Sequence, residues 1–108
     1  MGRLSGWAVM AALCAAPATA SAQETGSAQQ GLALAREVCA SCHAVERGQA
    51  FSPNSNAPTF DEVAGTPGMT ETALSVALRT SHREMPNLIL KSDEIADISA
   101  YILSLINP

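Results

Sequence analysis

The sequence is poor in aromatic residues and in basic charge. One tryptophan, one tyrosine and two phenylalanines occur among 108 residues, and Lys and Arg together number 6 against 10 Asp and Glu. Because phosphate binding needs a basic face, this balance argues against nucleic acid as a partner. So few aromatic residues also make a thin core, and a small domain of this kind is helped by a cofactor, a metal or a disulfide.

A long hydrophobic run is also missing, since a membrane-spanning helix needs about 20 apolar residues. The apolar stretch GWAVMAALCAA is shorter; it follows Arg3, is ended by Pro17 and precedes small residues. This order is typical of a secretory signal peptide rather than a retained anchor. We predict cleavage after Ala22, with Ala20 as the alternative.

The predicted organisation is a signal peptide over 1–22, a flexible N-terminus over 23–28 and one domain over 29–108. Cleavage removes one arginine and Cys14, so the formal net charge falls from −4 to −5 and two cysteines remain. Lipoprotein processing at Cys14 is disfavoured, because Leu13 before it is a poor fit for the small residue that such processing needs.

The two remaining cysteines lie in the motif CASCH, in which Cys39 and Cys42 are followed by His43. A disulfide between them would close a very short loop and add little stability. A thioredoxin-like redox pair needs strands on either side of a helix, and the sequence shows no convincing strand. A zinc site needs four nitrogen or sulfur ligands. The motif supplies three ligands that are nearly contiguous, and His82 is the one further candidate, so a closed tetrahedral site is awkward.

The motif C-x-x-C-H is instead the signal for covalent haem attachment. Two thioether bonds fasten the porphyrin edge, and the histidine that follows places its imidazole over the iron, so that all three groups are used. We therefore predict one haem c, bound through Cys39 and Cys42, with His43 as an iron ligand.

The segment 29–43 is predicted to be a helix, because Leu34, Val38 and Cys42 recur at four-residue spacing. Gly31 lies inside this segment, where glycine is costly relative to alanine. We expect it to allow another element to approach closely.

Three further helical segments are predicted, and no strand. A short turn over 59–65 is closed by Gly65, and a helix begins after the N-cap Thr70. The last helix begins at the cap Ser92 and shows an apolar stripe made of Ile95, Ile98, Ile102 and Leu105. The fold is therefore all-α, with three main helices. Loops as long as those between them are unusual in a compact domain unless they wrap round a flat cofactor.

The second iron ligand must come from chain distant from His43, and three side chains are candidates. Met85 precedes Pro86, which biases it away from helical geometry and leaves its side chain free to project. His82 is the rival, although a histidine at a helix end also suits the helix dipole. Met69 lies beside a helix start and is otherwise a core residue.

In these motifs the chain resembles the class I c-type cytochromes, small monohaem proteins of the bacterial periplasm. The resemblance covers 29–106 and rests on CASCH, APTF, MPNLIL and EIADISAYILSL. It implies the cytochrome c fold, with loops wrapped round one covalently attached haem and His43 and Met85 on the iron. It also implies a right-angled crossing of the first and last helices at Gly31 and Tyr101, and a hydrogen bond from His43 to the Pro58 carbonyl.

Two family features are missing from this chain. Ala35 stands where the family usually has an aromatic residue, four positions before the first cysteine. The tryptophan often found beside a haem propionate is also absent. These departures concern the helix packing and the propionate surroundings rather than the iron ligands.

Two protein ligands leave no open position on an iron, which predicts a one-electron carrier and not an enzyme. We expect a periplasmic monomer that exchanges electrons with redox proteins such as a dehydrogenase, oxidase or reductase, without stable membrane insertion after cleavage. Two alternatives remain: a gas binder or sensor with a labile Met85, and a haem subunit of a dehydrogenase complex. Peroxidase-like activity would require displacement of Met85.

Overall fold

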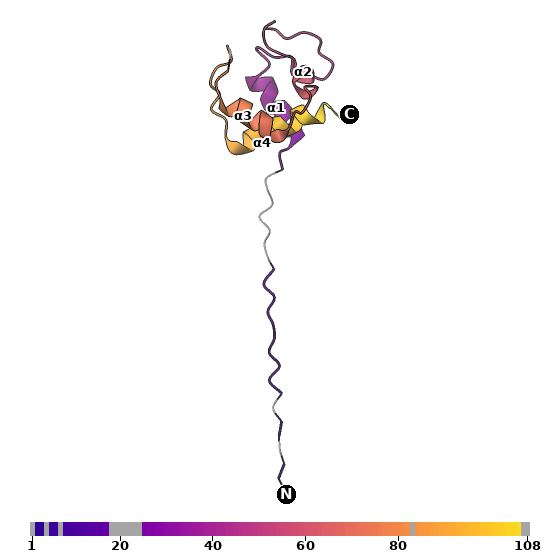
Figure 1. Ribbon diagram of the computed structural model, residues 1–108, viewed down its shortest axis with the longest axis vertical. Helices are drawn as coiled ribbons and strands as arrows, with labels where there is room; N and C mark the ends of the chain where they lie inside the picture. Colours follow the sequence, from indigo (N-terminus) through magenta and orange to yellow (C-terminus); the bar gives the residue numbers. More distant parts are fainter. Residues whose placement is uncertain (1, 4, 7, 18–24, 83, 107–108) are drawn as a thin grey trace.

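The computed structural model describes residues 2–3, 5–6, 8–17, 25–82 and 84–106, and these form four α-helices and no strand. The helices are α1 (Ala28–Val38), α2 (Phe60–Ala64), α3 (Glu71–Arg79) and α4 (Ser92–Ser104). They gather in one body, with long loops between α1 and α2 and between α3 and α4 (Figure 1). The predicted all-α class with three main helices is confirmed, and α2 is the predicted short turn.

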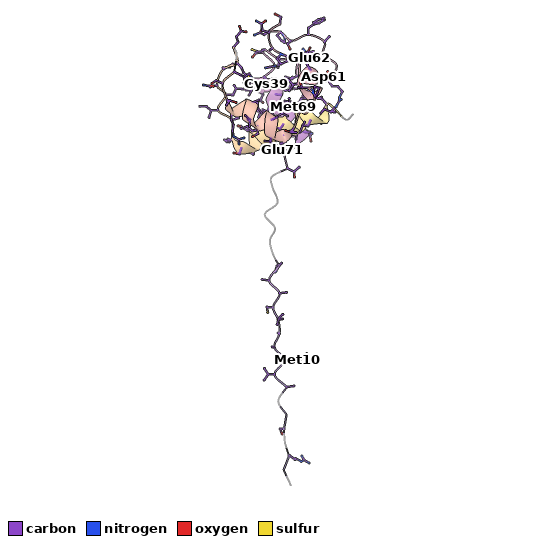
Figure 2. The ribbon with its side chains drawn as sticks, in the orientation of Figure 1. Met10, Cys39, Asp61, Glu62, Met69 and Glu71 are labelled. Atoms are coloured by element: carbon purple, nitrogen blue, oxygen red, sulfur yellow. The ribbon has the colours of Figure 1, made fainter. Side chains whose placement is uncertain are left out.

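The N-terminal residues 8–17 form no helix and extend away from this body (Figure 1). Figure 2 accordingly shows Met10 far from Cys39. No helix among the described residues is both long enough and apolar enough to cross a membrane. The predicted cleavage sites after Ala20 and Ala22 lie outside the described residues.

Helix α1 begins earlier than predicted, within the stretch that we expected to be flexible. Ser27 is its N-cap, accepting a hydrogen bond from the Gln30 N–H, and Ala28 is its first residue. The backbone N–H of Ser27 also donates to the Asp97 carboxylate at 2.8 Å, which ties the start of the domain to α4.

The same helix ends before the haem motif, so the prediction that CASCH is helical is wrong. The N–H groups of Cys39 and Ala40 both donate to the carbonyl of Ala35, at 2.8 and 3.0 Å. The second bond reaches back five residues instead of four, so the last turn is wider than an α-helical one and the helix ends there. A second turn follows, in which the N–H groups of Cys42 and His43 both donate to the carbonyl of Cys39.

Helices α1 and α4 make a close contact at Gly31. A Cβ atom at this position would lie 2.0 Å from the Asp97 carbonyl oxygen and 2.8 Å from the Tyr101 Cβ. The expectation that Gly31 lets another element approach closely is confirmed, and Tyr101 is the neighbour that the resemblance implied. Ala35 follows on the same buried face and is fully buried, so its small side chain suits the close approach.

The first turns of the helices are held by hydrogen bonds to side chains, and of these the Thr70 cap was predicted. In α2, Thr59 and Glu62 each accept a hydrogen bond from the other's backbone N–H, and in α3 the Thr70 hydroxyl accepts from the Ala73 N–H. The predicted cap Ser92 is wrong. Lys91 is the N-cap of α4, and its N–H donates to the Glu94 carboxylate at 2.7 Å.

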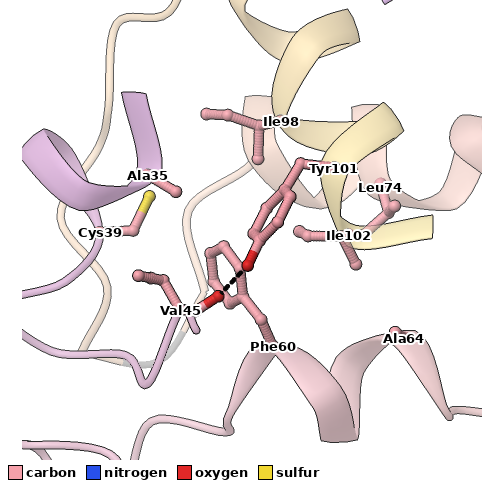
Figure 3. Close-up of a cluster of buried hydrophobic side chains, with 9 residues drawn as sticks. All are labelled: Ala35, Cys39, Val45, Phe60, Ala64, Leu74, Ile98, Tyr101 and Ile102. Carbon is pink, nitrogen blue, oxygen red and sulfur yellow. Dashed lines mark hydrogen bonds between the residues drawn. The ribbon is translucent and has the colours of Figure 1, made fainter. Parts of the chain in front are cut away.

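The core is small and joins α4 to the chain that follows the haem motif (Figure 3). The Tyr101 hydroxyl donates to the Val45 carbonyl, and the Phe60 ring packs against the Tyr101 ring at a centroid distance of 6.3 Å. The predicted stripe of α4 is buried at Ile95, Ile98 and Ile102. Val45 is two residues beyond His43, so this core also fixes the end of the motif.

We predict that Gly31→Ala lowers the free energy of unfolding by about 2 kcal/mol or more, because the added methyl must displace backbone of α4. Elsewhere in a helix this change is favourable by up to about 1 kcal/mol. Denaturant unfolding of the haem-loaded protein measures the effect. Ala33→Gly, on the exposed face of α1, is the control and should cost only about 1 kcal/mol. A Gly31→Ala protein as stable as the wild type would contradict the close contact.

Candidate functional site

A pocket of about 320 Å³ lies between the turns after α1, the loop before α2, helix α3 and the segment before α4. Apolar side chains from all parts of the fold form most of its wall: Val38, Phe60, Leu74, Leu78, Leu88 and Ile102. Ala77 on α3 also lines it and is exposed. The pocket therefore presents apolar surface that an apolar group of matching shape would cover.

Both cysteines of the motif line this pocket, and neither forms a disulfide. Cys39 is buried and Cys42 half-buried. Burial raises the pKa of the Cys39 thiol to about 11, so this group stays protonated near neutral pH. Thiol exchange uses the thiolate, so Cys39 lacks the environment of a redox-active cysteine.

The third group of the motif, His43, is held in a defined orientation. Its Nδ1 lies 2.7 Å from the Pro58 carbonyl oxygen, which is the contact that the resemblance implied. A carbonyl can only accept, so Nδ1 carries the proton, and in the neutral ring Nε2 is the nitrogen with a free lone pair, as a metal-binding imidazole requires. The Phe60 ring packs beside it at a centroid distance of 5.5 Å.

Of the three candidates for the second ligand, the structure places Met85 and His82 at the pocket. Met85 is half-buried, and its N–H donates to the His82 carbonyl at 3.1 Å, closing a turn. His82 is exposed, and its Nδ1 lies 3.2 Å from the Thr80 carbonyl oxygen. Met69 is not among the side chains that line the pocket. It packs against the core instead, within the body shown in Figure 2.

The donor set and the shape of the pocket fit a covalently attached porphyrin. Two thiols are available for thioether bonds, one imidazole has a free Nε2, and a thioether lies on the same pocket. The apolar wall supplies the surface that a flat macrocycle covers. A closed zinc site is a poorer match, because no group of three or more His, Cys, Asp or Glu side chains in the described part of the chain is placed to hold a metal.

Four polar residues of the pocket were not predicted from the sequence: Ser41, Asn54, Asn56 and Glu84. The asparagines indicated only a loop over 47–60. No sequence pattern marked Glu84 as a site residue, because a lone carboxylate in a loop is ordinarily solvated.

Comparison with known proteins identifies the class to which this site belongs. The profile of a family described as "Cytochrome C oxidase, cbb3-type, subunit III" matches residues 26–102. The chain is therefore a c-type cytochrome. It is also 36% identical over 102 residues to a protein named cytochrome c-552 from Bradyrhizobium diazoefficiens, with 94% of each chain covered. Together these matches show that it belongs to the class I c-type cytochromes. No solved structure matches significantly.

Membership of this family determines the chemistry of the site in outline. The cofactor is a covalent c-type haem with its iron, and Cys39 and Cys42 are present to attach it. The haem interpretation of CASCH and the prediction of an electron carrier are confirmed, and redox proteins are its partners.

We predict that the purified wild-type protein keeps its haem in acidified organic solvent, because two thioether bonds hold it. The variant Cys39→Ala/Cys42→Ala should release its pigment or fail to load it, and intact-mass spectrometry should show one haem on the wild type and none on this variant. Ser41→Ala, which keeps both cysteines of the motif, is the matched control and should carry one haem like the wild type. A wild-type protein that loses its haem on extraction would contradict covalent attachment.

Proposed function

We propose that this protein carries single electrons between redox proteins of the periplasm, with its iron held by His43 and Met85. The observation that carries the proposal is that an imidazole with a free Nε2 and a half-buried thioether line one apolar pocket together with both cysteines. The iron supplies one-electron uptake and release when the haem is bound.

Each side chain of the site has a role in this proposal. The Pro58 carbonyl keeps Nδ1 of His43 protonated, so that Nε2 is directed to the metal and the ring is made more basic. Met85 supplies a soft thioether ligand, and paired Met and His ligands raise the haem potential. Burial by the apolar wall limits access of water, which also tunes the potential.

We propose a carrier without enzymatic activity because His43 and Met85 together would leave the iron no free position for a substrate. A substrate could reach the metal only after one side chain had left it. Electron transfer has no such requirement, because the partner needs only to approach the exposed rim of the pocket, where Pro58, Pro86 and Glu84 lie. We propose that the protein works as a monomer that meets its partners transiently.

The second candidate is a haem-bearing component of a larger oxidase, which the description of the matching family favours. The length of the relative argues against this second candidate, because the match covers 94% of this chain and 94% of cytochrome c-552. A small cytochrome of the same extent is therefore the nearer comparison. Co-purification with a membrane oxidase under mild conditions would favour the second candidate.

Export is proposed from the sequence of residues 1–22 alone. A charged start, a short apolar run and small residues before Gln23 are typical of a cleaved signal peptide. The same intact-mass measurement that detects the haem also fixes the first residue, which should be Gln23. A protein that retains residues 1–22 would contradict cleavage.

Ligation by Met85 predicts a large effect of Met85→Ala. The reduced variant should bind carbon monoxide readily and have a lower reduction potential, because the soft ligand is lost. The wild type should bind it slowly, since the thioether must leave first. His82→Ala and Met69→Leu are the controls and should keep the wild-type potential. A potential that falls in His82→Ala instead would assign the ligand to His82, and rapid binding by the wild type would favour the gas binder.

A further inference from the structure

Two segments at the rim of the pocket are joined by one hydrogen bond between side chains. The Asn56 amide Nδ2 donates to the Glu84 carboxylate Oε2 at 3.2 Å. The two residues are 28 positions apart, and both line the pocket. The bond is exposed to solvent, so it contributes less than a buried hydrogen bond would. This contact connects the loop before α2 with the turn that contains Met85.

The Asn56 side of the contact is anchored to the cysteine turn. The Asn54 N–H donates to the Cys42 carbonyl at 3.1 Å, and the Asn56 N–H donates to the Asn54 side-chain oxygen at 2.9 Å. The Ala57 N–H donates to the Asn54 carbonyl at 3.0 Å and closes this turn. The position of the Asn56 side chain is therefore defined relative to Cys42, which attaches the haem.

The Glu84 side of the contact is a strained position next to Met85. Glu84 has φ 58°, in the left-handed region, and is the only residue other than glycine with positive φ in the described chain. Glutamate gains nothing from this conformation, which glycine or asparagine adopts more readily. The turn is closed by the Met85 N–H on the His82 carbonyl. Strain of this kind persists only where surrounding contacts offset it, and the hydrogen bond from Asn56 is such a contact for Glu84.

We propose that Asn56 and Glu84 form a polar strap across the pocket mouth that holds the turn of Met85 toward the cysteine turn. They are positioning residues, because they act through Met85. The proposal rests on the proposed function, in which Met85 is an iron ligand. Its consequence is that the strap slows departure of the thioether and so protects the iron from external ligands.

Carbon monoxide binding to the reduced, haem-loaded protein tests the strap, because the iron–sulfur bond of Met85 must break before the iron–carbon bond forms. The variants Asn56→Ala and Glu84→Gly should each raise the binding rate by about two- to fivefold, the effect of losing one solvent-exposed hydrogen bond. The double variant should react no faster than either single one, because both remove the same contact.

Three matched variants distinguish loss of the strap from unrelated causes of a faster reaction. Glu84→Gln keeps an acceptor oxygen and should stay close to the wild-type rate. Glu84→Ala removes the same contact without the added backbone freedom of glycine, so a rise equal to that of Glu84→Gly shows that the side-chain contact, and not backbone freedom, holds the turn. Gln30→Ala, an exposed change on α1, should leave the rate unchanged. The melting temperature of every variant shows whether a rate change reflects general loosening of the fold.

Wild-type rates in both Asn56→Ala and Glu84→Gly would overturn the strap while leaving Met85 as the ligand. If either variant fails to load haem, Asn56→Ser and Glu84→Ala remove the same contact and carry the test. Met85→Ala distinguishes failure of the strap from failure of the proposed ligation. If the wild type already binds carbon monoxide as fast as Met85→Ala, ligation by Met85 is wrong, and the strap is overturned with it.

Discussion

The contact of α1 with α4 at Gly31 is the constraint on which the rest of the structure depends. Because residue 31 has no side chain, α1 lies directly against the backbone at Asp97, and the buried face of α1 continues through Ala35. The carbonyl of Ala35 then ends the helix by accepting two N–H groups. The position of Cys39, and through it of the whole haem motif, follows from how closely the two helices meet.

The small core explains why a cofactor suits this fold. Phe60 and Tyr101 are the two aromatic side chains of the core, and they connect α2 and α4 to the chain just beyond His43. They leave an apolar pocket, lined by Phe60 and His43, that protein atoms cover only in part. Covalent attachment places a large apolar group at this pocket without requiring more aromatic residues from a short chain.

The features predictable from the sequence were those with a strong local pattern. The spacing of CASCH, the stripe of α4 and the glycine inside α1 each have one dominant physical cause. The end of α1 at Val38 was not predictable, because apolar spacing continues past it and the deciding bond reaches back five residues. The cap at Lys91 and the contact of Asn56 with Glu84 depend on side chains whose types carry little preference for those roles.

The identity of the second ligand is the central claim, and methyl NMR of the reduced protein labelled in its methionines tests it most directly. Methionine occurs at four positions, of which only Met69 and Met85 follow the predicted cleavage site. A methyl group bound over the porphyrin is shifted far upfield by the ring current. The account predicts one such resonance, lost in Met85→Leu and kept in Met69→Leu. A spectrum with no shifted methyl, or with one lost in Met69→Leu, would contradict it.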